Sequence, residues 1–130
     1  MDSVPENSAE TAMSYETWEE RRVYKRYPTD LPVRFRWMND TEEPYNKGVV
    51  KNVSLNGMFV QTENVGSTGT VLELLINVIT PFGEVSEIVA EGKITWTGNK
   101  PGESGMGLCF TRIDRHAQYA LLASAHHDYP

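Results

Sequence analysis

Apolar and polar residues alternate with a period of two in three stretches of the chain after residue 30, namely 31–37, 87–96 and 106–110. In the first such stretch the odd positions are apolar, namely Leu31, Val33, Phe35 and Trp37. The even positions are Pro32, Arg34 and Arg36. Successive side chains of a β-strand point to opposite faces, so this stretch is predicted to be a strand with one buried face. Trp37 is expected to lie in the core with the other three.

Five further segments have the composition of strands and are separated by turn signals. The segments are 47–53, 58–61, 70–79, 87–96 and 106–110. Leu55-Asn56-Gly57 predicts the break between the strands at 47–53 and 58–61. Pro81-Phe82-Gly83 predicts a hairpin between the strands at 70–79 and 87–96. In the segment 87–96 one face collects Ile88, Ala90, Gly92, Ile94 and Trp96, so Trp96 is also expected in the core.

A helix is predicted after the last strand. Thr111-x-x-Asp114 resembles a capping box. The residues expected on one side of the helix are Ile113, Ala117, Ala120, Leu121 and Ser124. Six short strands and one helix indicate a closed antiparallel barrel or a sandwich, with the helix over an open end or on the outer wall.

Residues 1–20 are predicted to be an acidic, flexible extension, because they are polar and lack an apolar period. Within this region the stretch to about Ser14 is expected to be disordered, and a short helix is considered around 15–25. The domain is expected to span 21–126, with a tail at 127–130. No apolar run approaches the roughly 20 residues that span a bilayer, and no secretory signal pattern is present, so we expect a soluble protein without membrane insertion. Cys109 is the only cysteine, which excludes an intramolecular disulfide and favours the cytoplasm.

The formal net charge of −6 is concentrated in the N-terminal extension. Residues 1–20 contain six acids and no Lys or Arg, whereas the other 110 residues contain 12 acids and 12 bases. Arg21, Arg22, Lys25 and Arg26 follow at once, and no acid occurs again until Asp30. This cluster is a candidate anion site on an otherwise neutral domain.

The arginine cluster has two interpretations. Guanidinium groups present planar paired donors that match phosphate oxygens and the O6/N7 edge of guanine, so Arg22 and Arg26 could hold a guanine nucleotide at several points. Alternatively, the cluster is a solvated basic stretch that balances the acids of the extension.

A second candidate motif, Asn52-x-Ser54-x-x-Gly57, lies at the break between two predicted strands. The Asn amide can pair with the edge of a guanine, Ser can bond a phosphate or a base, and Gly57 is expected to adopt a backbone angle denied to other residues. The alternative is an ordinary tight turn with local hydrogen bonds.

The two motifs in this order, Arg22-Val-Tyr-Lys-Arg26 and Asn52-Val-Ser54-Leu-Asn-Gly57, resemble the PilZ domain family. The segments Gly92-Lys-Ile-Thr-Trp96 and Gly105-Met-Gly107-Leu-Cys-Phe110 and the C-terminal helix support the resemblance, which covers roughly residues 20 to 125.

The resemblance implies a mostly β fold, a six-stranded antiparallel β-barrel of PilZ type with a C-terminal α-helix, in a bacterial receptor for cyclic di-GMP. By this resemblance, Arg22 and Arg26 hold guanine edges and phosphates, and Asn52, Ser54 and Gly57 line the opposite wall. Arg21 stands where family members that bind a stacked pair of ligand molecules carry a basic residue. No cofactor and no metal are expected besides the ligand.

The expected function is therefore that of a sensor. Cyclic di-GMP would order the segment 18–28, and the altered surface would signal to an unknown protein partner. The main alternative is a ligand-independent PilZ-like adaptor. A barrel that binds single-stranded nucleic acid through Arg34, Arg36 and Trp37 is disfavoured by the net acidity. An enzyme is not expected, because neither a nucleophile–histidine pair nor a spaced carboxylate pair is marked out.

Overall fold

The computed structural model describes residues 25–40, 42–80, 82–100 and 102–128. It contains six strands followed by one helix, as predicted. The elements are β1 (Tyr27–Trp37), β2 (Asn46–Val53), β3 (Gly57–Gln61), β4 (Val71–Ile79), β5 (Val85–Gly98), β6 (Gly105–Ile113) and α2 (Arg115–Asp128). Arg21 and Arg22 lie outside the described residues.

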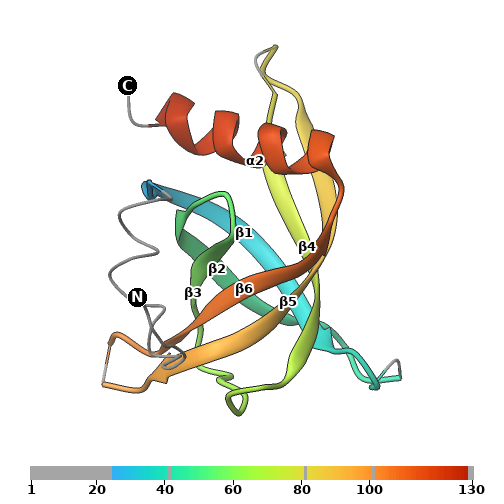
Figure 1. Ribbon diagram of the computed structural model, residues 1–130, viewed down its shortest axis with the longest axis vertical. Helices are drawn as coiled ribbons and strands as arrows, with labels where there is room; N and C mark the ends of the chain where they lie inside the picture. Colours follow the sequence, from blue (N-terminus) through green and yellow to red (C-terminus); the bar gives the residue numbers. More distant parts are fainter. Residues whose placement is uncertain (1–24, 41, 81, 101, 129–130) are drawn as a thin grey trace, which may run out of the picture.

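The six strands form a closed antiparallel barrel in the order β1-β2-β3-β6-β5-β4 (Figure 1). Because β1 pairs with both β2 and β4, each strand has a partner on either side. The predicted hairpin joins β4 to β5, where Ile79 pairs with Val85 and Gly83 has a positive φ of 83°. Of the two architectures left open by the strand pattern, the chain therefore adopts the barrel rather than the sandwich.

The core fills the inside of the barrel with the alternate residues of each strand. In β1 the predicted inner face is confirmed, since Leu31, Val33 and Phe35 are at most 2% exposed. The inner residues of β4, Leu72, Leu74 and Ile76, are completely buried. Burial of aliphatic side chains at about 25 cal/mol per Å² is the main stabilising contribution to such a barrel.

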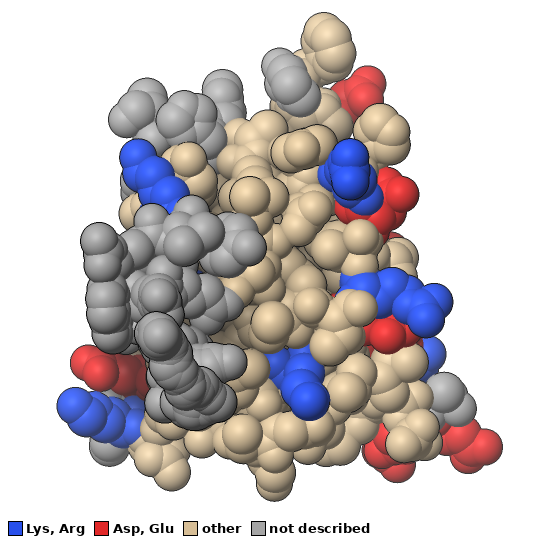
Figure 2. Space-filling model, in the orientation of Figure 1, with Lys and Arg blue, Asp and Glu red and all other residues tan. Residues whose placement is uncertain are grey.

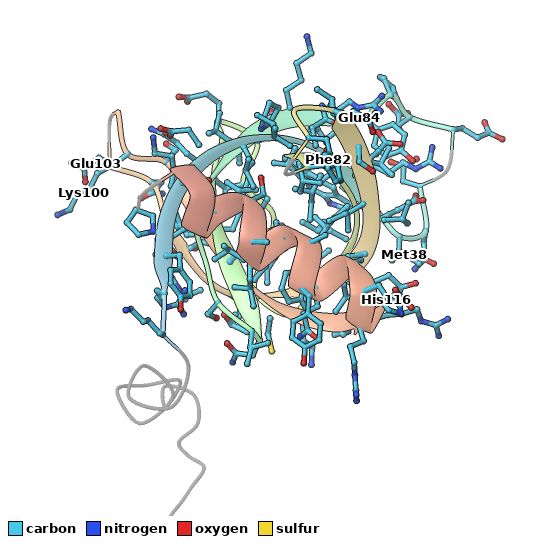
Figure 3. The ribbon with its side chains drawn as sticks, turned by 90° about the horizontal axis from the view of Figure 1, so that it is seen from above. Met38, Phe82, Glu84, Lys100, Glu103 and His116 are labelled. Atoms are coloured by element: carbon cyan, nitrogen blue, oxygen red, sulfur yellow. The ribbon has the colours of Figure 1, made fainter. Side chains whose placement is uncertain are left out.

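Helix α2 lies across one end of the barrel (Figures 1 and 3). Leu121 and Ala125 on its inner side are completely buried, and the Ser124 Oγ accepts a hydrogen bond from the backbone N–H of Ile79 at 3.2 Å. The helix packs against β1, β2, β4 and β5, so it closes the core rather than lying on the outer wall. Ala120, which was predicted on the inner side, is exposed.

The helix start differs from the predicted capping box. Asp114 is itself the N-cap, because its Oδ2 accepts hydrogen bonds from the backbone N–H groups of His116 at 3.0 Å and Ala117 at 3.3 Å. Thr111 belongs to β6 instead. Among the described residues, no helix is long and apolar enough to cross a membrane.

The two tryptophans expected in the core differ in burial. Trp37 is half-buried and stacks on Phe35, with ring centroids 5.9 Å apart. Trp96 is 45% exposed, so its predicted burial is wrong. The reason is a β-bulge in β5: Ile94 pairs with Leu108 and Trp96 with Gly107, which leaves one extra residue on β5 and turns Trp96 outward.

Candidate functional site

A second β-bulge positions Asn52 on the outside of the barrel. Val50 pairs with Val60 and Asn52 with Phe59, so Lys51 is an extra residue on β2. Val50 and Val53 are completely buried, and both residues between them are half-buried. The bulge thus places Lys51 and Asn52 together on the outer wall, where a regular strand would place only one.

Arg26 brings the first motif to the second. It lies directly before β1, and its Nη1 donates a hydrogen bond of 3.0 Å to the Oδ1 of Asn52. The pairing of β1 with β2 explains the contact, because Pro28 lies opposite Asn52 in the register. Beside it, Lys51 forms an ion pair with Asp30. Residues that are 26 positions apart in the chain are therefore in contact at the predicted site.

The turn between β2 and β3 is held together by its own residues. The backbone N–H of Ser54 donates to the carbonyl of Gly57 at 2.8 Å, and the Ser54 hydroxyl donates to the Oδ1 of Asn56 at 2.7 Å. Ser54 is only 1% exposed. Gln118 of α2 also donates to the carbonyl of Leu55. In this structure the Ser54 hydroxyl is directed into the turn, which accords with the local hydrogen bonding of a tight turn.

Gly57 is required by a close approach between strands. It does not have the positive φ that the sequence suggested. A Cβ at this position would lie 2.0 Å from the carbonyl oxygen of Leu108, 3.1 Å from the carbonyl carbon of the same residue and 3.3 Å from the Cα of Cys109. All three atoms belong to the backbone of β6. The glycine of the motif therefore allows β3 to pair with β6.

An aromatic pair beside Asn52 was missed by the sequence reasoning. The rings of Phe59 and Trp96 stack with centroids 5.3 Å apart and an interplanar angle of 15°. The Phe59 ring lies over Gly105 and the Trp96 indole over Gly107, since a Cβ on these glycines would be 2.4 Å from the Phe59 Cζ and 2.1 Å from the Trp96 Nε1. We call Phe59 and Trp96 the aromatic platform. The alternate glycines of Gly105-Met-Gly107 were its one signal in the sequence.

A groove of about 490 Å³ runs over the aromatic platform. It is lined by Lys51, Asn52, Phe59, Gln61, Trp96, Gly98, Lys100 and Glu103. Lys100 and Glu103 come from the loop between β5 and β6, which projects at one side of the barrel (Figure 3). The groove therefore combines the exposed Trp96 ring and the half-buried Phe59 ring with an Asn amide, two ammonium groups and one carboxylate. This set suits a ligand with both rings and negative charge.

The arginines considered for nucleic-acid contact have partners within the fold. Arg34 pairs with Glu87 at 2.7 Å and Arg36 with Glu73 at 2.9 Å. The hydrogen bond to Glu73 raises the pKa of Arg36 above its ordinary value. The Arg36 guanidinium carbon also lies 4.4 Å from the ring centroid of Tyr45. On the face seen in Figure 2, basic and acidic side chains lie mainly around the margin of a broad area with few charges. These pairings weaken the nucleic-acid interpretation.

Comparison with models of known protein families identifies one family. A family model described as PilZ domain matches residues 20–125. Comparison with curated proteins gives no significant match.

Three solved structures are similar in fold. The Bacillus subtilis inhibitor of motility (MotI/DgrA) has a TM-score of 0.67 and 23% identity, covering 83% of this chain and 51% of that one. This chain therefore spans about half the length of that protein. The PilZ domain of CeSA from a cellulose-synthesising bacterium has a TM-score of 0.54 and 18% identity, covering 81% and 98%. The PilZ domain with c-di-GMP of YcgR from Escherichia coli has a TM-score of 0.61 and 11% identity, covering 83% and 93%.

Proposed function

Because the chain belongs to the PilZ domain family, we propose that it binds cyclic di-GMP on the barrel wall at Arg26 and Asn52 and signals the bound state to a protein partner. The family is one of cyclic di-GMP receptors, and the similar YcgR domain was solved with c-di-GMP. The observation that carries the proposal is the 3.0 Å hydrogen bond from Arg26 to Asn52, which joins the two motifs in space.

The chemistry of these two side chains fits a guanine nucleotide. A guanidinium has five N–H donors, and the bond to Asn52 uses one, so Arg26 keeps donors for a guanine edge or a phosphate. The Asn52 amide has donors of its own. Arg22, four residues before Arg26, would add a second guanidinium on the same ligand. Gly57 and Ser54 contribute by shaping the turn that follows Asn52.

The aromatic platform supplies a stacking surface next to these polar groups. Trp96 is 45% exposed and lines the same groove as Asn52. A base that stacks on an exposed aromatic ring gains about 1–3 kcal/mol regardless of its identity. We assign Trp96 to the stacking of one guanine, while Arg26 and Asn52 provide the selection for guanine over other bases.

Calorimetric titration with cyclic di-GMP at fixed salt tests the proposal. The affinity is expected to fall about tenfold to a hundredfold in Arg22→Ala and in Asn52→Ala, because each removes a multidentate contact. The Arg34→Ala variant is the matched control, since Arg34 pairs with Glu87 and does not line the groove. Its affinity should equal that of the wild type. Absence of binding heat in the wild type would overturn the proposal and favour the ligand-independent adaptor.

The same titration determines how many ligand molecules bind. A stacked pair predicts two per chain, with Arg21 neutralising part of the added phosphate charge. Arg21→Ala should then lower the stoichiometry to one. A wild-type stoichiometry of one would contradict the role assigned to Arg21 and leave that of Arg26 intact.

A further inference from the structure

The groove over the aromatic platform exposes an apolar surface that one segment of this chain is suited to cover. We propose that residues 15–20, Tyr-Glu-Thr-Trp-Glu-Glu, pack into the groove and compete with cyclic di-GMP for it. These residues lie outside the described part of the chain. The contact itself does not depend on the ligand, whereas the competition rests on the proposed function.

The chemistry of the segment complements that of the groove. Two aromatic residues, Tyr15 and Trp18, stand among three glutamates and no base. The groove offers the aromatic platform as its apolar surface, and Lys51 and Lys100 against one acid, Glu103. Since Lys51 also pairs with Asp30, the positive charge that the groove itself offers the segment comes mainly from Lys100. Arg26, which donates a hydrogen bond to the neutral Asn52, adds to it, and Arg21, Arg22 and Lys25 adjoin the segment in the chain.

The segment can reach the groove from the start of β1. Arg26 contacts Asn52, which lines one end of the groove, and Trp96 lies across β3 and β6 on β5. On the side of the barrel that carries β2, β3 and β6, four strand spacings separate β1 from β5, about 19 Å at the usual 4.8 Å each. Six extended residues span about 20 Å. Six residues are therefore enough for the chain to extend from Arg26 to Trp96, and Glu20 is six positions before Arg26. Glu20 and the residues before it can thus reach the platform and Lys100, which lines the same groove.

An occupied groove would lower the affinity for the ligand. Asn52 is both a groove residue and a member of the second motif, so the segment and a nucleotide would need the same surface. The three glutamates would also repel phosphates there. Residues 15–20 would thus raise the concentration of cyclic di-GMP at which the domain responds.

The first experiment needs no ligand and measures how well acrylamide quenches the fluorescence of Trp96. The parent is the full chain with Trp18→Phe and Trp37→Phe, which leaves Trp96 as the single tryptophan. Acrylamide is uncharged, so its quenching reports how far the Trp96 ring is covered and does not depend on the local electrostatic potential. Replacing Glu16, Glu19 and Glu20 by Gln should raise the quenching constant about twofold at low salt, and added salt should do the same in the parent because it screens exposed pairs.

The matched control carries the same change in charge farther from the groove. Asp2→Asn, Glu6→Gln and Glu10→Gln together should leave the quenching of Trp96 unchanged. We call the variant with Gln at positions 16, 19 and 20 the proximal variant and this control the distal variant. Equal quenching in the parent and the proximal variant would overturn the proposal. Equal increases in the proximal and distal variants would overturn it as well. Shielding that grows with protein concentration would also overturn it, because the occupant would then be a segment of a second copy.

A charge reversal tests the assignment of Lys100. The Lys100→Glu variant should expose Trp96 as much as the proximal variant does, and adding Glu19→Lys and Glu20→Lys should restore the shielding. Failure of the restoration would refute the pairing of this segment with Lys100. Lys47→Glu is the control, since Lys47 is an exposed lysine of β2 that does not line the groove.

Titration with cyclic di-GMP then separates this inference from the proposed function. At low salt the proximal variant should bind about threefold to tenfold more tightly than the wild type, the distal variant should not, and high salt should remove the difference. If neither the wild type nor any variant binds, the proposed function fails while the quenching result still decides the contact. If all bind equally, the competition is refuted.

Discussion

Replacing Gly57 by Ala should destabilise the barrel itself, before any effect on a ligand. The new Cβ would lie 2.0 Å from the carbonyl oxygen of Leu108, and real Cβ atoms essentially never approach a heavy atom closer than 3.0 Å. The obstructing atoms are backbone, so no side chain can rotate away. Relief requires β3 and β6 to separate locally by about 1 Å in a barrel whose other strands hold them in register.

The cost follows from that geometry. Inserting one methyl into a well-packed site costs about 1–3 kcal/mol, and the upper end applies because the backbone hydrogen bonds of the β3–β6 pair must lengthen. A loss of about 3 kcal/mol corresponds to a decrease in Tm of roughly 12–15 °C for a domain of about 100 residues. Loss of ligand binding by Gly57→Ala would then be a consequence of the altered fold.

Thermal and urea unfolding of Gly57→Ala and Gly98→Ala would measure this effect. Gly98 is the matched control, because a Cβ there would meet only the Trp96 Cζ3 at 3.6 Å, an ordinary contact. Its substitution should change the free energy of unfolding by less than about 0.5 kcal/mol. Wild-type stability in Gly57→Ala would refute the reasoning and would mean that this glycine serves the ligand alone.

Two further predictions concern helix α2. Asp114→Ala should lower the free energy of unfolding by about 1 kcal/mol, because it removes the acceptor for the backbone N–H groups of His116 and Ala117, whereas Asp114→Asn should retain most of it. Urea unfolding that is identical for Asp114→Ala and the wild type would contradict the assigned cap. Leu121→Ala should cost about 2–5 kcal/mol, since Leu121 is completely buried where the helix closes the barrel. Tyr119→Ala, at a residue 58% exposed on the same helix, is its control and should be nearly neutral in the same assay.

The strand pattern was readable in the sequence because it depends on local periodicity. The inner residues of β1 follow from alternation alone, whereas β4 was recognised by its nearly continuous apolar and β-branched residues, and the turns follow from Asn, Pro and Gly. The two motifs were also visible, since each is contiguous in the chain. Their resemblance to one family predicted the six-stranded barrel, which the strand pattern alone left open between a barrel and a sandwich.

The groove, by contrast, depends on which residues face each other across strands. The bulges that turn Asn52 and Trp96 outward are defined by their partners on β3 and β6, so a strict period of two placed Trp96 in the core. The bulge in β2 is reflected in the spacing of its buried residues, because Val50 and Val53 are three positions apart instead of two or four.

The sequence by itself thus determined the strands, the turn and the arginine cluster. The contact between Arg26 and Asn52 and the stacking of Phe59 on Trp96 were decided only by the tertiary structure. The physical reason is that pairing between distant strands selects which exposed side chains become neighbours, and a single inserted residue changes the face on which a side chain lies.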